Sequence, residues 1–177
     1  MADVPGAQIP VTLRPGRPTD TSACGRICYE AFEAIARQHN FAPDFPSVDI
    51  ATGLITMLLS HPRFFSVVAE AGGEVVGSNF LDERSAIAGV GPITVNPRAQ
   101  NLRIGRRLMQ AVLDRATERK FPGVRLLQSA YHSRSLALYA TMGFLPRESI
   151  ACMQGPAIGV LPSGYQVRRA VEADLEV

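Results

Sequence analysis

Residues 95–108 read VNPRAQNLRIGRRL, and this stretch decides the fold. An apolar run ends at Val95, Pro97 breaks the strand, and apolar positions recur at helical spacing from Ile104 onward. The stretch therefore predicts a strand, a tight loop and the first turn of a helix. A helix N-terminus presents unpaired N–H groups and the positive end of the helix dipole, and both attract a phosphate group.

Glycine and arginine in the same stretch favour a diphosphate ligand. Gly105 lets the backbone approach a ligand closely. Positive charge comes from a cluster of four arginines, Arg98, Arg103, Arg106 and Arg107. We interpret the stretch as a diphosphate-binding turn, although these residues alone fit an ordinary strand-to-helix connection equally well.

The bulk composition predicts a single globular domain. The chain has 177 residues, of which 46% are hydrophobic, and this is enough for a sizeable core. The net charge of +2 is too small to indicate nucleic-acid binding. No apolar run reaches the ~20 residues of a membrane helix, and residues 1–10, which we expect to be a flexible tail, lack a signal-peptide pattern. We expect a cytoplasmic protein with neither a nucleic-acid nor a membrane partner.

Three cysteines, Cys24, Cys28 and Cys152, do not form a metal-binding pattern. Cys24 and Cys28 lie four residues apart on one face of an expected helix, and no histidine or cysteine follows at a ligand spacing. An odd number of cysteines fits a reducing compartment. We interpret all three as packing residues and expect no metal.

The periodicity of the chain predicts an α/β fold. Two helices follow the first strand, and an antiparallel hairpin then turns at Gly72-Gly73. The expected strands cover residues 11–14, 64–71, 74–81, 86–95, 124–130, 149–153 and 165–170, and the expected helices start near residues 21, 48, 104 and 134. This order predicts a mixed, mostly antiparallel central sheet with helices on both faces.

The expected strand over residues 86–95 contains Gly89, Gly91 and Pro92. Proline cannot donate a hydrogen bond to a sheet, so in the middle of one it occurs at a bulge or an edge. The sequence therefore predicts a bulge near Gly91-Pro92. Such a bulge would push the strand away from its neighbour and leave backbone groups available to a ligand.

Two segments resemble motifs of the GCN5-related N-acetyltransferase (GNAT) family. Residues 100–105, QNLRIG, resemble its acyl-CoA pyrophosphate signature, Gln/Arg-x-x-Gly-x-Gly/Ala. Residues 132–144, HSRSLALYATMGF, resemble its segment Asn-x-x-Ala-x-x-Leu-Tyr-x-x-x-Gly-Phe. The resemblance covers about residues 11–155, and it implies a GNAT domain whose sheet is splayed between strands 4 and 5, which end at Val95 and Ala130.

The resemblance also implies acetyl-CoA, or another acyl-CoA, as co-substrate. Its pantetheine arm would pair with the bulged strand, and the amides of residues 101–106 would hold its pyrophosphate. The residues that the resemblance assigns to this ligand are Ile93, Thr94, Val95, Gln100, Asn101, Leu102, Arg103, Ile104, Gly105, Arg106, His132, Ser135 and Tyr139.

The chain departs from the two motifs at three positions. Arg103 replaces the first signature glycine, and a left-handed backbone there would cost roughly 1 kcal/mol. The arginine would in return add a charge-assisted contact to the ligand. His132 replaces the usual asparagine and Ser135 the usual alanine.

The chemistry of acetyl transfer to an amine needs both a base and an acid. A lysine-like amine, with a pKa of about 10.4, is almost fully protonated at pH 7, so a base or a water path must take a proton. Tyr139 matches the tyrosine that serves as acid toward the CoA thiolate in the family; the alternative is that its ring only packs against the ligand. Many relatives carry a carboxylate on the bulged strand, where this chain has Gly89.

The sequence therefore does not identify the general base. Asp82 and Glu83 are the nearest carboxylates in sequence, and we take Glu83 as the candidate, although a solvated turn is the alternative. His132 and a water relay are the other options. His39 lies in a loop that would border the acceptor site, and we expect that loop to be a wall of the pocket.

The C-terminal region repeats the opening of the chain. Residues 13–20, LRPGRPTD, align with residues 167–174, VRRAVEAD. Residues 156–177 are either a linker and the last strand of the first domain or the start of a truncated second GNAT-like domain. A truncated strand would expose its edge and favour a homodimer.

These features together predict an acyl-CoA-dependent N-acyltransferase. The simplest version transfers acetyl directly from acetyl-CoA to a primary amine on a small molecule or peptide. The alternative is a non-catalytic GNAT-like module that binds acyl-CoA or a protein. A different nucleotide-binding α/β protein is disfavoured because the chain has neither a GxGxxG nor a GKS/T element.

Overall fold

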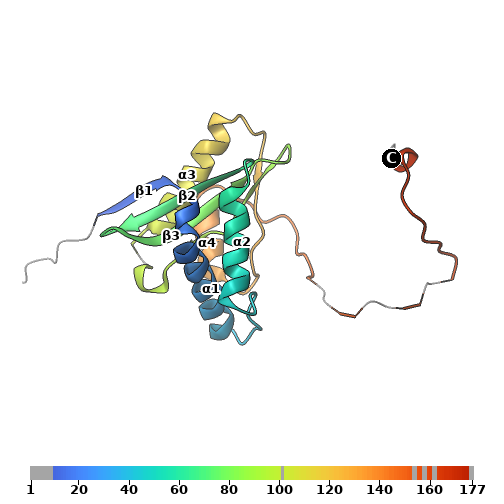
Figure 1. Cartoon of the computed structure of the whole chain (residues 1–177), viewed down its shortest axis with the longest axis horizontal. Coiled ribbons are helices and arrows are strands. Elements are labelled where there is room, and N and C mark those ends of the chain that lie inside the picture. Colours follow the sequence, from blue (N-terminus) through green and yellow to red (C-terminus); the bar gives the residue numbers. More distant parts are fainter. Residues whose placement is uncertain (1–9, 101, 153–154, 157–158, 161–162, 176–177) are drawn as a thin grey trace, which may run out of the picture. The chain divides into compact units, whose positions relative to one another are not determined.

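A long antiparallel hairpin forms the centre of the sheet in the computed structural model, which describes residues 10–100, 102–152, 155–156, 159–160 and 163–175. β2 (Phe64–Ala71) and β3 (Glu74–Asp82) pair along their whole length, and Gly72 and Gly73 turn between them with positive φ. The sheet order is β1-β2-β3-β4-β6, with β5 also paired to β3 (Figure 1). The remaining strands are β1 (Val11–Pro15), β4 (Ala88–Val90), β5 (Thr94–Val95) and β6 (Val124–Arg125).

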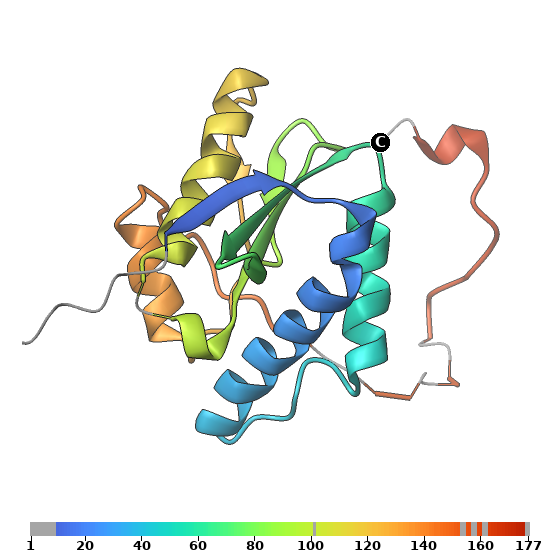
Figure 2. The ribbon, with the colours of Figure 1, turned by 60° about the vertical axis from the view of Figure 1, so that its left-hand side comes forward.

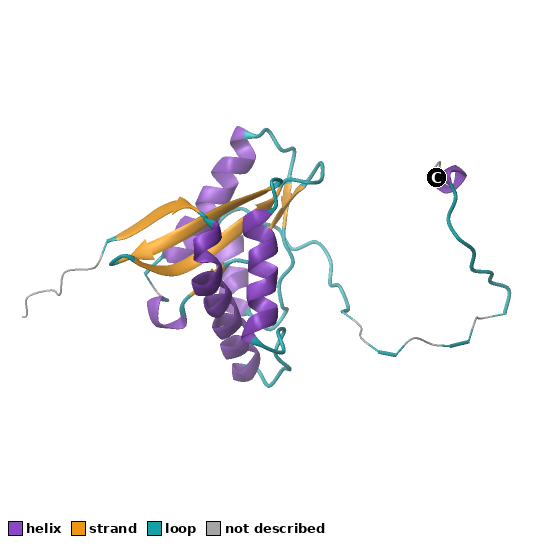
Figure 3. Ribbon diagram, in the orientation of Figure 1, coloured by secondary structure: helices purple, strands orange, loops and turns teal. Residues whose placement is uncertain are grey.

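Helices cover both faces of this sheet (Figure 3). Residues that alternate along the central strands enter two different cores. Val68 and Phe80 pack with buried residues of α1 and α2 on one face, whereas Val67 and Leu81 pack with α3 on the other. The helices are α1 (Thr21–Gln38), α2 (Val48–Ser60), α3 (Ile104–Glu118) and α4 (Ser133–Ala140), with short 3₁₀ turns η1 (Pro18–Asp20), η2 (Pro97–Ala99) and η3 (Glu172–Leu175).

The predicted fold class is confirmed. Every strand pair is antiparallel except β4 with β6. Ser47 caps α2, since its Oγ accepts a hydrogen bond from the backbone N–H of Ile50. Asp20 precedes α1 but does not cap it, because its carboxylate is bonded to Arg14 and to the N–H of Arg17 instead.

The predicted bulge is present. Val90 pairs with Leu81 of β3, and Thr94 pairs with Ser78 of β3. Four residues therefore separate the two pairs on the bulged strand but only three on β3, so the bulged strand holds one extra residue. The N–H of Gly91 bonds to the carbonyl of Phe80, and the backbone then swings away until Thr94.

The sheet splays just after this bulge, on the side of the hairpin away from β1. Figure 2 shows α1 and α2 side by side where they cover one face of this sheet. β4 is flanked by β3 and β6, but within the described part of the chain β5 pairs with β3 alone. The expected strand over residues 124–130 is shorter than predicted, since β6 ends at Arg125 and residues 126–130 leave the sheet. One edge of β5 therefore faces open space instead of another strand.

Contacts within the chain divide it into two units, Met1–Phe144 and Leu145–Val177. The strands expected over residues 149–153 and 165–170 are wrong, because their described residues form none. Residue 153, and residues 1–9 of the expected tail, lie outside the described residues. A strand needs a partner at hydrogen-bonding distance, and an alternating sequence alone does not supply one.

A small hydrogen-bonded motif occurs in both units, and we call it the arginine clasp. In the first unit Arg14 binds Asp20 through two hydrogen bonds of 2.7 and 2.8 Å, and Asp20 also accepts the N–H of Arg17. In the second unit Arg168 binds Asp174 through two hydrogen bonds of 2.7 and 2.6 Å, and Asp174 also accepts the N–H of Val171. The predicted sequence repeat is thus also a repeat of local structure.

The cysteines are not alike. Cys24 and Cys28 are buried between α1 and the sheet, and burial raises their pKa values to about 11 and about 12. Both thiols therefore stay protonated and serve as packing residues. Cys152 is exposed, so the interpretation of it as a packing residue was wrong.

Candidate functional site

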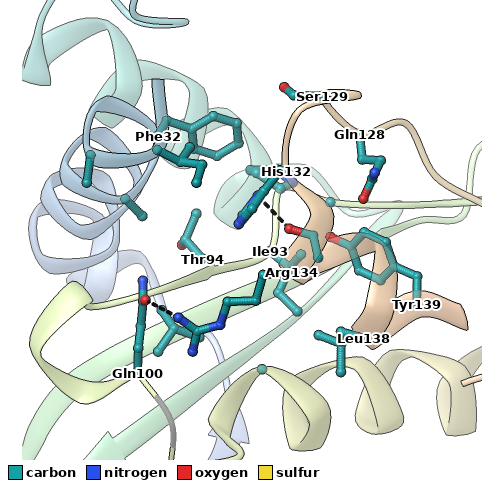
Figure 4. A pocket seen from close by; sticks show the side chains of 18 of the residues that line it. Phe32, Ile93, Thr94, Gln100, Gln128, Ser129, His132, Arg134, Leu138 and Tyr139 are labelled. Atoms are coloured by element: carbon teal, nitrogen blue, oxygen red, sulfur yellow. Dashed lines mark hydrogen bonds between the residues drawn. The ribbon is translucent and has the colours of Figure 1, made fainter. Parts of the chain in front are cut away.

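A pocket of about 680 Å³ lies where β5 and the chain after β6 separate (Figure 4). One wall is the last part of α1, including Phe32 and Ile35, together with His39 directly after the helix. The opposite walls are the bulged segment 90–95, the N-terminus of α3, residues 126–129 and α4. The splayed sheet thus creates a cavity lined by strand edge, helix end and two helix faces.

The N-terminus of α3 forms one end of the pocket. Arg103 precedes α3 with a left-handed backbone, φ 57° and ψ 16°, as expected for a position that is glycine in the family motif. A Cβ on Gly105 would lie 3.5 Å from Leu138 and 3.9 Å from Val95, both of which line the pocket. The first turn of α3 therefore offers backbone N–H groups to the cavity with no side chain in front of Gly105.

Side chains around this helix end are polar and basic. Arg134 donates a hydrogen bond of 2.9 Å to the Oε1 of Gln100, and Arg106 donates one of 3.1 Å to the Oγ1 of Thr141. Arg103 also lines the pocket. Three guanidinium groups and a helix N-terminus give this end a positive potential suited to a phosphate ligand.

Tyr139 and two residues of the preceding turns form the other end. Tyr139 is only 8% exposed, and burial raises the pKa of its hydroxyl, whereas the neighbouring Ser135 side chain acts to lower it. The Oγ of Ser135 lies 2.5 Å from the Nδ1 of His132. Burial lowers the pKa of His132, and the nearby charges of Arg134 and His39 lower it further.

The structure brings most of the predicted ligand-binding residues together. Eleven of them line this pocket: Ile93, Thr94, Val95, Gln100, Arg103, Ile104, Gly105, Arg106, His132, Ser135 and Tyr139. Leu102 is half exposed and is not part of the lining, and Asn101 lies outside the described residues.

Glu83 is not brought to the pocket. Its carboxylate accepts a hydrogen bond of 2.7 Å from Arg115 on α3 and lies 3.7 Å from Arg119. Asp82 is bonded to Arg84, which lowers its pKa, and it does not line the pocket either. Proximity in sequence to the bulged strand was therefore a poor guide to the base.

Phe32 and Gln128 are among the lining residues that the sequence analysis did not predict. Phe32 projects from α1 and packs edge-on against Phe45, with the centroids of the two rings 5.3 Å apart. Gln128 follows β6, and its Oε1 is buried without a hydrogen-bond partner in the described structure. A buried acceptor of this kind needs a donor, and a ligand N–H can supply it. Phe32 could have been predicted, because it lies near Ile35 on one side of an amphipathic helix. No sequence pattern indicates that Gln128 lines the pocket.

The described residues contain no group of three or more His, Cys, Asp and Glu side chains placed to hold a metal ion. Among the same residues, no helix combines the length and the apolar character that crossing a membrane requires.

Comparison with solved structures gives the same fold. The PaiA N-acetyltransferase of Thermoplasma acidophilum, solved with coenzyme A, is 14% identical with a TM-score of 0.67, over 80% of this chain and 93% of that one. The aminoglycoside N-acetyltransferase AAC(6')-Iy, solved with CoA, is 15% identical with a TM-score of 0.66, over 87% of this chain and 99% of that one. A predicted acetyltransferase of Clostridium acetobutylicum, solved with acetyl-CoA, is 12% identical with a TM-score of 0.63, over 82% of this chain and 96% of that one.

These likenesses show the fold alone, and no curated protein was found to match the sequence. The sequence does match the model of the Acetyltransferase (GNAT) family over residues 25–144. This match covers more than half of the chain and includes the bulge, the N-terminus of α3 and α4. The chain therefore belongs to the GNAT family of acetyltransferases.

Proposed function

We propose that this protein transfers the acetyl group of acetyl-CoA directly to a primary amine of a small molecule or peptide. The observation that carries the proposal is a single pocket that joins the free edge of β5, the N-terminus of α3 and the buried Tyr139. Membership of the GNAT family and the CoA or acetyl-CoA bound to proteins of the same fold support it.

The residues present fit an acyl-CoA. The left-handed turn at Arg103 and the absent side chain at Gly105 leave room for a diphosphate at the N-terminus of α3. The unpaired edge of Ile93 to Val95 provides backbone groups for an amide-bearing arm, as in strand addition. When bound, acetyl-CoA supplies an activated acetyl group as a thioester.

Tyr139 is the proposed acid. Its raised pKa keeps the hydroxyl protonated at neutral pH, so it has a proton to give to a departing thiolate. Its burial at the base of the pocket excludes water, which strengthens a hydrogen bond to a developing negative charge.

A non-catalytic acyl-CoA-binding module is the second candidate function. It is favoured by Arg103, which adopts a strained backbone where the family motif has glycine, and by Gly89, which leaves the bulged strand without a carboxylate. Both candidates share the ligand, so binding alone does not separate them.

The test combines calorimetry with acetyl-CoA and a thiol-release assay over a panel of primary amines. Micromolar binding and amine-dependent release of CoA are expected. Tyr139→Phe should lower kcat about 10- to 100-fold with little change in CoA affinity. Binding without turnover across the panel would favour the non-catalytic module, and no binding at high micromolar acetyl-CoA would reject both functions.

A further inference from the structure

Three side chains of the α4 segment lie in sequence along one wall of the pocket. His132, Ser135 and Tyr139 are spaced three and four residues apart, which places them on one face over two turns. We propose that they form a proton path in which His132 is the general base for the amine and Ser135 connects it to Tyr139. This deepens the proposed function, on which it rests.

The first link of the path is short. The Nδ1 of His132 and the Oγ of Ser135 are 2.5 Å apart. The second link is proposed between Ser135 and Tyr139, which lie four residues apart on α4 and so on the same face of the helix. In agreement with this placement, the Ser135 side chain acts to lower the pKa of the Tyr139 hydroxyl. Both His132 and Tyr139 line the pocket, and Figure 4 shows the hydroxyl of Tyr139 on the side of its ring that is turned toward His132.

The proposed path needs one of the two arrangements of hydrogens in which all donors point in the same direction, the one with the His132 proton on Nδ1. In that arrangement His132 would donate to Ser135, Ser135 would donate to Tyr139, and the hydroxyl of Tyr139 would be left to donate to the pocket. The same tautomer leaves the Nε2 lone pair of His132 free to accept a proton. Figure 4 shows the ring between Phe32 and Tyr139, where an amine acceptor would enter.

The surroundings of His132 favour the neutral form that a base requires. The titratable and charged groups that face it are His39, which directly follows α1, Arg134 from the same segment, and Tyr139 from α4. The described lining of the pocket includes no carboxylate that would hold the imidazole in its charged form. Burial lowers the pKa of His132, and the electrostatic effects of Arg134 and His39 lower it further, which favours the neutral imidazole.

The proposed transfer balances in protons and bonds. The substrate ammonium first loses one proton to solvent, and the neutral amine nitrogen then bonds to the acetyl carbon while the bond from that carbon to sulfur breaks. The amine proton moves to Nε2 of His132, the Nδ1 proton to Ser135, the Ser135 proton to Tyr139, and the Tyr139 proton to the departing sulfur. All three residues end neutral, and exchange with solvent restores the starting tautomer of His132.

This path also accounts for two departures from the family motif. His132 stands where the motif has asparagine and Ser135 where it has alanine, and these two substituted residues are bonded to each other. The bulged strand, where relatives carry a carboxylate, has Gly89 and supplies no base. In the proposed path, His132 and Ser135 therefore supply the general base from the α4 segment instead of from the sheet.

The substitutions that test the path restore the family residues. His132→Asn and Ser135→Ala should each lower kcat about 100-fold, a far larger effect than any change in the Kd for acetyl-CoA. The double variant should be no slower than the worse single variant, because both break one path. Ser135→Thr, which keeps the hydroxyl, should recover most of the activity. His61→Asn is the control, since His61 does not line the pocket.

Two readouts go beyond turnover rate. The pH profile of kcat/KM should fall with one proton below the pKa of His132, and His132→Asn should remove this limb. In ¹⁵N NMR, His132 should show a protonated Nδ1 that becomes exchange-broadened in Ser135→Ala; only three histidines need assignment.

Independent, multiplying effects of the two substitutions, or a loss confined to acetyl-CoA affinity, would overturn the path. If the wild-type protein binds acetyl-CoA but acetylates nothing, the proposed function fails first. The NMR signal then still decides whether His132 holds its proton on Nδ1 toward Ser135, and a proton on Nε2 would reject the path by itself.

Discussion

Glu83 accepts a hydrogen bond of 2.7 Å from the Nε of Arg115, and its side chain is only 9% exposed. The guanidinium of Arg115 also lies 5.3 Å from the ring of Phe65 on β2. This contact fastens α3 to the sheet at the end of β3. The carboxylate of Glu83, which is close to the bulged strand in sequence, thus binds Arg115 and holds α3 against the sheet.

Glu83→Gln should therefore reduce stability and spare catalysis. Loss of a largely buried, charge-assisted hydrogen bond is expected to lower the free energy of unfolding by about 2 kcal/mol. Urea unfolding measures this, and kcat at a temperature where the variant is folded should match that of the wild type. A large loss of kcat with unchanged stability would instead return Glu83 to the active site.

Arg103 offers a direct test of backbone strain. Arg103→Gly and Arg103→Ala remove the same guanidinium, but only glycine adopts the left-handed conformation without a steric penalty. The glycine variant should be more stable than the alanine variant by about 1 kcal/mol in urea unfolding. Calorimetry should show that both weaken acetyl-CoA binding to a similar extent, since both lose one positive charge at the helix end.

Gly105→Ala should separate stability from binding. The new methyl group would meet Leu138 and Val95 at ordinary contact distances, and alanine is the better helix former, so the melting temperature should stay the same or rise. The methyl group faces the pocket, and acetyl-CoA binding should weaken at least tenfold. Gly53→Ala on α2, where a Cβ meets nothing within 4 Å, is the matched control and should leave binding unchanged.

The charge of the pocket predicts which amines are good acceptors. Its described lining contains no aspartate or glutamate that could pair with the ammonium groups of an acceptor, while Phe32 and Ile35 make one wall apolar. A monoamine on an aromatic or aliphatic body should be preferred at least tenfold in kcat/KM over a polycationic aminoglycoside. A higher kcat/KM for the aminoglycoside would show that its charges are neutralised by groups outside this lining.

Asp20 should make stability depend on pH. The guanidinium of Arg14 is the main cause that lowers the pKa of Asp20, and the N–H of Arg17 adds to it. The stabilisation is therefore present above the pKa of an unfolded aspartate, about 3.9, and is lost as the pH falls through the lower pKa of the folded state. Asp20→Asn should cost about 2 kcal/mol at pH 7 and progressively less below pH 4.

Urea unfolding at several pH values measures this dependence. Asp174→Asn is the matched control, because it breaks the same pair of hydrogen bonds in the second unit, where both side chains are more exposed. It should leave the unfolding midpoint of the first unit unchanged. An equal effect of the two substitutions would contradict the role given to burial of Asp20.

Local features of the fold were predictable because local rules determine them. The hairpin at Gly72-Gly73 follows from turn chemistry and alternation, and the bulge follows from a proline in a strand. The left-handed backbone of Arg103 follows from its alignment with a motif glycine. Each of these signals lies within a few residues of the structure it predicts.

The predictions that were wrong concern features that depend on residues distant in sequence. Residues 124–130 resemble a buried strand in sequence, but the splay leaves residues 126–130 without a neighbouring strand to pair with among the described residues. Glu83 was placed by its distance along the chain, whereas the fold turns it toward Arg115. Phe32 and Gln128 line one pocket from segments nearly a hundred residues apart, and no local pattern joins them.

The arginine clasp has a consequence for how the chain folds. In the first unit Arg14 also binds Glu70 of β2 at 2.6 Å, whereas in the second unit the clasp forms with no strand beside it among the described residues. An arginine and an aspartate six residues later are thus enough to build it. Closing so short a loop takes well under a microsecond and costs little chain entropy. The boundary between β1 and α1 can therefore be set early in folding, before β1 finds its place beside β2.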